Sequence, residues 1–143
     1  MASKGQRTGM RGVYLVAVEL IKRGLIVSPT SRSSAGADLL VTDESCSRAF
    51  SVQVKTNGKP ASFWLVGKHA ATLRATSHIY VLVNLNEKNG ADLHEYFVIP
   101  SRRLSKMVTK EKRPNSIWYS VYRPDLKRYR DKWECFGAHA KTI

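Results

Sequence analysis

The chain has few of the residues that build metal clusters or disulfide scaffolds. Its two cysteines, Cys46 and Cys135, match no metal-binding spacing and need not pair, which suits a reducing cytoplasm. The four histidines include no close pair, so a zinc site is not indicated. No apolar run approaches the length of a membrane span, and no hydrophobic signal core precedes a small-residue cleavage site. We therefore expect a cytoplasmic protein without a membrane segment.

Several common functional motifs are also absent from the sequence. There is no glycine-rich phosphate loop and no dinucleotide-binding fingerprint. The serine-rich segment 30–34 has no nucleophile elbow around it, so acyl-transfer chemistry has no support. No aromatic strand motif of the RNA-recognition type appears.

Acidic residues are scarce relative to basic ones. The chain has 24 Lys and Arg against 11 Asp and Glu, giving a net charge of +13 and a pI near 10.1. Such a surplus indicates a polyanionic partner, most commonly nucleic acid, and no basic amphipathic helix supports a membrane surface instead.

The surplus is largest in residues 101–143, which hold twelve Lys or Arg and four Asp or Glu, net +8. This segment also carries five aromatic residues: Trp118, Tyr119, Tyr122, Tyr129 and Trp133. Interleaved basic and aromatic side chains can hold a phosphate backbone and stack on bases. The simpler interpretation is that the aromatic residues are core and the charges form a solvated face.

The length of 143 residues and a hydrophobic content of 43% indicate a single domain, 1–143, that buries a core without covalent staples. Residues 1–12 are basic, polar and contain glycine, which indicates a frayed end, with 1–8 as a flexible basic N-terminus. Residues 101–143 form a basic, aromatic-rich C-terminal extension.

The expected elements alternate between helix and strand. Apolar residues at helical spacing predict a helix over 12–24, stopped by Gly24. Strands are expected at 25–27, around Asp38, and at 50–56, 63–66, 79–83 and 96–100, with further helices at 68–75, 102–108 and 125–133. Ser101 is expected to cap the helix at 102–108. This order predicts a mixed α/β sandwich around one sheet.

One predicted hairpin brings polar residues together. Residues 50–56 alternate strictly, with Gln53 and Lys55 on the face opposite the apolar side chains. If Asp43 pairs with Arg48 across a short loop, Asp38 lies directly opposite Gln53, because paired residue numbers in an antiparallel ladder share a constant sum. Directly opposed residues share a face, and a slip of one residue would separate them.

An acid, an amide and a lysine on one face suit metal-assisted phosphodiester hydrolysis. Mg²⁺ prefers oxygen ligands, and a bound ion activates water and polarises a phosphoryl oxygen. Glu19, in an otherwise apolar helical stretch, is a third candidate oxygen donor. Each residue also has a structural explanation: Asp38 in a turn, Gln53 and Lys55 on a solvated strand, and Glu19 paired with Lys22 or Arg23.

The ordered set resembles the PD-(D/E)XK, or restriction-endonuclease-like, nuclease superfamily, and within it small prokaryotic members related to archaeal Holliday-junction resolvases. The resemblance lies in the helix at 13–24, the Ala37-Asp38-Leu39-Leu40 segment and Val52-Gln53-Val54-Lys55-Thr56. The segments at 63–66, 80–83 and 97–101 also look like such proteins. The resemblance implies an αβββαβ core, with a mixed central sheet flanked by helices, and a divalent-metal-dependent DNA endonuclease, with junction-like structure-selective substrates.

Carried over by position, Glu19, Asp38 and Gln53 would bind Mg²⁺ or Mn²⁺, and Lys55 would act at the attacking water or the scissile phosphate. The sequence departs from the commoner pattern at Gln53, where glutamate is more usual, so the metal site loses one negative charge. A homodimer would suit paired cuts on a duplex or junction. The alternatives are a catalytically inactive nucleic-acid-binding protein that retains the nuclease fold, and a basic subunit of a larger complex. The expected DNA contacts are Arg32, Ser33, Ser34, Lys59, Arg102, Arg103 and Lys106.

Overall fold

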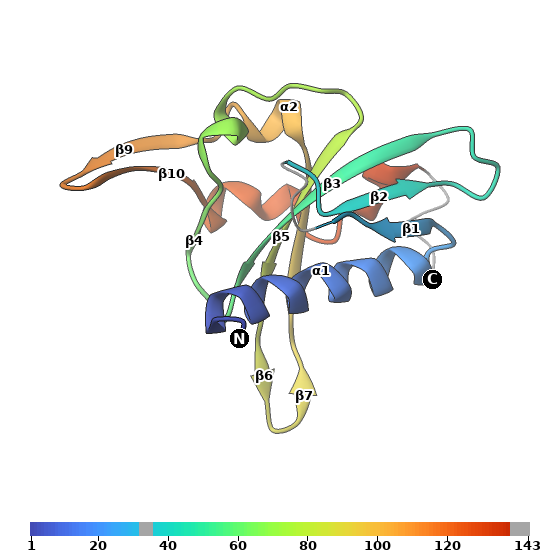
Figure 1. Cartoon of the computed structure of the whole chain (residues 1–143), viewed down its shortest axis with the longest axis horizontal. Coiled ribbons are helices and arrows are strands. Elements are labelled where there is room, and N and C mark those ends of the chain that lie inside the picture. Colours follow the sequence, from blue (N-terminus) through green and yellow to red (C-terminus); the bar gives the residue numbers. More distant parts are fainter. Residues whose placement is uncertain (32–35, 138–143) are drawn as a thin grey trace.

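The computed structural model describes residues 1–31 and 36–137, and a five-stranded mixed sheet lies at its centre (Figure 1). The strand order is β1-β2-β3-β5-β8, in which β3 and β5 are parallel and the other neighbours are antiparallel. The strands of this sheet are β1 (Ile26–Pro29), β2 (Leu39–Thr42), β3 (Ala49–Asn57), β5 (His78–Asn84) and β8 (Glu95–Pro100). The expected mixed α/β fold is confirmed.

Two small sheets and five helical segments complete the described structure. The small sheets are formed by β4 (Phe63–Leu65), β10 (Ser116–Tyr122) and β9 (Thr109–Arg113), and by β6 (Glu87–Lys88) and β7 (Ala91–Asp92). The α-helices are α1 (Lys4–Lys22) and α2 (Ser101–Leu104). The 3-10 helices are η1 (Lys68–Ala71), η2 (Arg123–Tyr129) and η3 (Trp133–Phe136). None of the helices in the described ranges is long and apolar enough to cross a bilayer.

The helix α1 begins eight residues before the predicted start. Residues 4–11, expected to fray, are helical because Ser3 and Gln6 form a capping box: the Ser3 hydroxyl accepts from the Gln6 N–H, and the Gln6 side chain accepts from the Ser3 N–H. The expectation of a flexible segment over 1–8 is therefore wrong for residues 4–8. The extra turns carry the basic residues Lys4, Arg7 and Arg11, on a helix that packs along β3.

The predicted register of the β2–β3 hairpin is confirmed. Leu39 pairs with Val52 and Thr42 with Ala49, and the Asp43 N–H donates to the Arg48 carbonyl. This is the alignment that places Asp38 opposite Gln53. Alternate burial along β3 then sends Val52 and Val54 into the core, while Gln53 and Lys55 lie on the other face, half-buried.

Each face of the central sheet has its own hydrophobic cluster. On one face, Val16 and Leu20 of α1 and Phe136 of η3 pack on β3 and β5. On the other, residues of β4, β10, α2 and η2 pack on Tyr80 and Leu82 of β5. Every residue of β5 is buried, as the run of apolar residues at 79–83 predicted.

The connection from β3 to β5 departs from the expected αβββαβ order. It contains β4 and the single 3-10 turn η1 where the resemblance implies an α-helix and the sequence predicted one over 68–75. Gly67, with a backbone φ of 85°, lies between these two pieces and redirects the chain.

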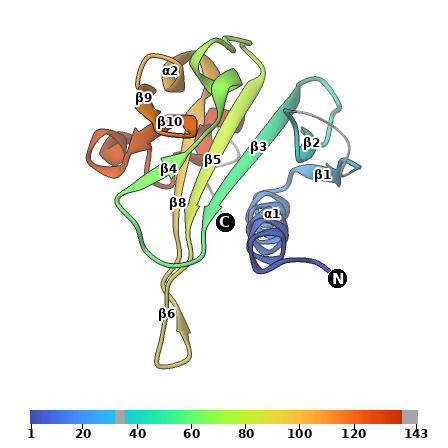
Figure 2. The same ribbon diagram turned by 60° about the vertical axis from the view of Figure 1, so that its left-hand side comes forward.

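The C-terminal part differs most from the sequence-based expectation. Ser101 does not cap a helix over 102–108: its hydroxyl donates to the Ala75 carbonyl at 2.7 Å, and α2 ends at Leu104. Residues 109–122 form the β9–β10 hairpin, which was not predicted, and the helix expected over 125–133 is the 3-10 segment η2. The hairpin projects from the body of the molecule (Figure 1), and Figure 2 shows it on the same side as β4.

Candidate active site

Asp38 lies directly before β2, at a point where β3 continues past the end of its neighbour. One carboxylate oxygen, Oδ2, accepts from the Val54 N–H at 2.8 Å and from the Gln53 side-chain amide at 3.0 Å. The first bond satisfies a backbone donor that β2 does not reach, so the carboxylate takes the place of a strand partner. The structure therefore brings Asp38 and Gln53 together, as the register predicted.

Lys55 lies two residues beyond Gln53 on the same face of β3. Parallel pairing puts Gln53 next to Tyr80 and Lys55 next to Leu82 of β5. The Lys55 side chain is half-buried on that face.

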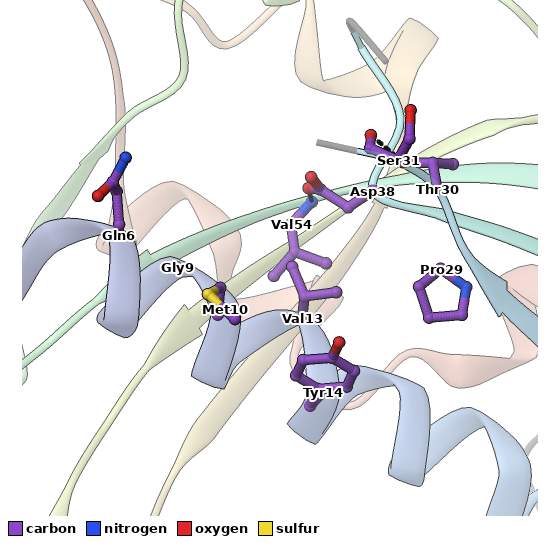
Figure 3. Close-up of a pocket in the computed structure, with 10 residues that line it drawn as sticks. All are labelled: Gln6, Gly9, Met10, Val13, Tyr14, Pro29, Thr30, Ser31, Asp38 and Val54. Atoms are coloured by element: carbon purple, nitrogen blue, oxygen red, sulfur yellow. Dashed lines mark hydrogen bonds between the residues drawn. The ribbon is translucent and has the colours of Figure 1, made fainter. Parts of the chain in front are cut away.

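Asp38 also borders a cavity of about 360 Å³ between α1 and the end of β1. Figure 3 shows its carboxylate next to the Val54 backbone nitrogen, above Val13 and Met10 of α1. Thr30 holds the Asp38 side of the cavity in place, because its N–H donates to the Asp38 carbonyl and its hydroxyl donates to the Ala37 carbonyl. Three of the expected phosphate contacts, Arg32, Ser33 and Ser34, lie outside the described residues.

Glu19 does not lie beside Asp38. The α1 residues at the cavity are Gln6, Gly9, Met10, Val13 and Tyr14, and Glu19 is six residues beyond Val13, about 9 Å farther along the helix and on another side of it. Its carboxylate pairs instead with Arg23 at 3.0 Å and Lys22 at 3.4 Å. The expectation that Glu19 completes the metal site is corrected, because the pairing within the helix explains this residue.

A histidine that sequence reasoning set aside belongs to this neighbourhood. His78, at the start of β5, is buried and hydrogen-bonded through Nδ1 to the Ser51 hydroxyl at 2.6 Å. Burial lowers the pKa of His78, and the negative charge of Asp38 opposes that shift. No motif marks His78, since only the parallel pairing of β3 with β5 places it on the face of Gln53.

Basic residues gather where α1 passes the end of β3. Lys4, Arg7 and Arg11 of α1 and Lys59 of the following turn line one open cavity. Arg11 forms an ion pair with Glu87, and Arg7 donates to the Ala2 carbonyl. Lys59 was one of the expected DNA contacts. The three helical residues lie in a segment that was expected to fray, and they were not named among those contacts. A second exposed basic group comprises the expected contacts Arg102, Arg103 and Lys106, on and after α2.

Glu87, Asp92 and His94 form a separate cluster at the β6–β7 hairpin, with one ligand atom of each within 4.8 Å of the others. The Asn86 N–H donates to Nδ1 of His94, so Nε2 of the neutral ring carries the proton and has no lone pair for a metal. Glu87 is also paired with Arg11. We therefore assign no metal to this cluster.

No protein-family model and no curated protein sequence matches the chain. Among solved structures it is similar to Hjc, a Holliday junction resolvase from the archaeal hyperthermophile Archaeoglobus fulgidus, at 13% identity and a TM-score of 0.49. The similarity covers 82% of this chain and 86% of that one. A likeness of this extent does not establish a family, so the function must be inferred from the site.

Proposed function

We propose that this protein is a divalent-metal-dependent DNA endonuclease whose site comprises Asp38, Gln53 and Lys55. The observation that carries the proposal is the contact between Asp38 and Gln53 at 3.0 Å, with Lys55 on the same face of the same strand. The net charge of +13 supports a polyanionic substrate.

The donor set suits Mg²⁺ or Mn²⁺. Asp38 supplies a carboxylate and Gln53 an amide oxygen, and Mg²⁺ commonly binds through one or two such protein groups while substrate phosphate and water complete its shell. The amide of Gln53 would turn so that its oxygen, rather than its nitrogen, faces the Asp38 carboxylate. When bound, the ion would polarise a phosphoryl oxygen and activate water.

The side chains themselves position the substrate and offset charge. The Val54 N–H holds one oxygen of Asp38, which fixes the carboxylate. The Lys55 ammonium would neutralise charge that develops on the phosphate. The cations Lys4, Arg7 and Lys59 would hold the phosphate backbone without reading sequence.

A second candidate function is that of a non-catalytic DNA-binding protein with the same fold. The position of Glu19 favours it, because the site then has one carboxylate and one neutral amide as its protein ligands in the described residues. Both candidates predict that the protein binds DNA, but only the endonuclease would cleave it.

Cleavage assays separate these candidates. Supercoiled plasmid, a four-way junction and a flap duplex are incubated with the protein and Mg²⁺, Mn²⁺ or EDTA. We expect metal-dependent cleavage that Asp38→Asn and Lys55→Ala each lower by at least about a hundredfold, since each removes a group that acts on the reacting phosphate. DNA binding in EDTA should persist in both variants.

The matched control is Asp125→Asn, which removes an exposed carboxylate of η2 and should leave cleavage unchanged. Binding without cleavage of any substrate would refute the endonuclease and favour the non-catalytic protein. Cleavage that survives Asp38→Asn would exclude this site or reveal a contaminating nuclease. A homodimer would present two such sites, and sedimentation velocity of the same samples measures the oligomeric state.

A further inference from the structure

A second basic cavity lies at the end of β8, where α2 and η2 both contact this strand. It has a volume of about 390 Å³, and four cationic residues border it: Arg102 and Arg103 of α2, Arg128 of η2, and Lys132 directly before η3. The three arginines are exposed and the lysine is half-buried. The sequence predicted the two arginines of α2 as DNA contacts, and the fold adds two cations from a distant segment to the same hollow.

No carboxylate side chain borders this cavity. All eleven Asp and Glu residues of the chain lie in the described ranges, and none is among the residues that line it. Asp131, the acid directly before Lys132, lies 4.0 Å from Arg130 instead. The four cations of the cavity form no ion pair in the described part of the chain. Because like charges repel, the fold holds this cluster at a cost that a bound anion would remove.

Buried neighbours hold the backbone on both sides of the cavity. Ser101 and Leu104 are fully buried, so α2 is fixed at both of its ends. On the other side, Tyr129 is buried next to Arg128, and the Lys132 ammonium lies 5.5 Å from the centre of its ring. An anion would therefore meet cations whose main chain is already in place, which lowers the cost of ordering the site.

The chemistry of these side chains suits a phosphate group with more than one negative charge. Each guanidinium presents a planar fork of N–H donors that pairs with two phosphate oxygens, and the lysine adds a point charge. A phosphodiester of a nucleic-acid backbone carries one negative charge, whereas a terminal phosphate carries about 1.5 to 2 at pH 7. Four unpaired cations around one cavity exceed what a single backbone phosphodiester would neutralise.

We propose that the cavity between α2 and η2 binds a phosphate group that carries more than one negative charge, with Arg102, Arg103, Arg128 and Lys132 as its ligands. Such a group occurs at the end of a nucleic-acid strand and in free diphosphates, and the test separates these two sources. The inference goes beyond the proposed cleavage and does not depend on it, because none of the three proposed active-site residues borders this cavity and binding is measured without metal.

Isothermal titration calorimetry of the full-length protein with pyrophosphate, in EDTA at neutral pH and constant ionic strength, tests the site. We expect saturable binding that Arg102→Gln and Arg128→Gln each weaken by about tenfold or more, since each removes hydrogen bonds to a charged group. The matched control is Lys127→Gln, which removes the same charge from the adjacent, exposed position of η2 outside the cavity. It should weaken binding by less than about twofold.

A fluorescein-labelled duplex of about 20 base pairs, with either 5′-phosphate or 5′-hydroxyl ends, identifies the source of the phosphate. A preference for the phosphorylated duplex that Arg128→Gln removes would assign the ligand to a nucleic-acid end. Equal affinity for the two duplexes, together with pyrophosphate binding that depends on Arg128, would assign it to a free phosphorylated molecule.

Three results would overturn the proposal. The first is that pyrophosphate does not bind to the wild-type protein, and the second is that neither cavity substitution weakens its binding. The third is an equal loss of affinity in Lys127→Gln and Arg128→Gln, because the effect would then arise from the overall positive charge and not from the cavity. Thermal unfolding of each variant checks that these substitutions of exposed side chains leave the protein folded.

Discussion

The substitution Gln53→Glu tests the candidate metal site more directly than a substitution that abolishes activity does. In the structure the Gln53 amide donates to Oδ2 of Asp38 at 3.0 Å. Glutamate has nearly the same shape, but it replaces this donor with a second carboxylate facing the first. Without metal the two negative charges repel, and with metal they form a stronger ligand pair.

The expected loss of stability without metal has two parts. Losing a hydrogen bond to a charged acceptor costs about 1.5–3 kcal/mol. Two like charges about 4 Å apart repel by about 4 kcal/mol at an effective dielectric constant of 20, which half-exposed groups reduce to about 1 kcal/mol. We therefore expect about 2–4 kcal/mol in EDTA at pH 8, which lowers the Tm by roughly 6–12 °C in a chain of this size.

Thermal unfolding in EDTA and in millimolar Mn²⁺ measures both effects. A ligand present at a hundred times its Kd stabilises the folded state by about 2.7 kcal/mol. Because the extra carboxylate tightens binding, Mn²⁺ should raise the Tm of Gln53→Glu more than that of the wild type. Gln53→Ala is the matched control: it removes the hydrogen bond without adding charge, so it should lose less stability in EDTA and respond least to metal.

Two results would refute this reasoning. If Mn²⁺ shifts the Tm of Gln53→Glu and the wild type equally, Gln53 is not a ligand. If Gln53→Glu is as stable as the wild type in EDTA at pH 8, Asp38 and Gln53 are not in contact.

Two further predictions concern packing and pH. A Cβ added at Gly12 would lie 1.8 Å from Oγ1 of Thr56, so Gly12→Ala should lower the free energy of unfolding by about 1–3 kcal/mol in urea titrations. Gly9→Ala, where the added Cβ meets no described atom within 4 Å, should instead stabilise α1 by up to about 1 kcal/mol, and equal effects would contradict the packing of α1 on β3. Burial lowers the pKa of His78 below 6.5, so the unfolded chain takes up a proton first as the pH falls below that value, and stability decreases from there towards the folded pKa. His78→Gln should flatten this decrease in unfolding free energy below about pH 6.5, whereas the exposed control His69→Gln should not. Identical slopes for His78→Gln and the wild type would show that His78 is not held neutral.

The part of the site that the sequence predicted is local. Strict alternation in β3 assigned Gln53 and Lys55 to one face, and a loop of four residues after Asp43 fixed the register that brings Asp38 opposite Gln53. Both follow from the geometry of one hairpin. The prediction for Glu19 went wrong, because an acid in an apolar helix has two explanations, and a contact with Arg23 one turn later satisfied it.

In the C-terminal region, local sequence signals did not predict the structure. Ser101 precedes a basic segment and looks like a helix cap, but its hydroxyl bonds to the Ala75 carbonyl, 26 residues earlier. The β9–β10 hairpin was missed because β9 is mostly charged and becomes a strand by pairing with β10. Its aromatic residues divide between core and surface only once Val121 is placed against Trp64.

The sequence alone therefore determined the strand alternation, the hairpin register, the positive charge and the mixed α/β class, since each depends on neighbours along the chain. The tertiary structure decided which side of α1 meets Asp38, that His78 of β5 joins the face of Gln53, and that β4 pairs with the distant strand β10. These features arise from parallel pairing and from packing between distant segments, and residue spacing in a single chain encodes neither.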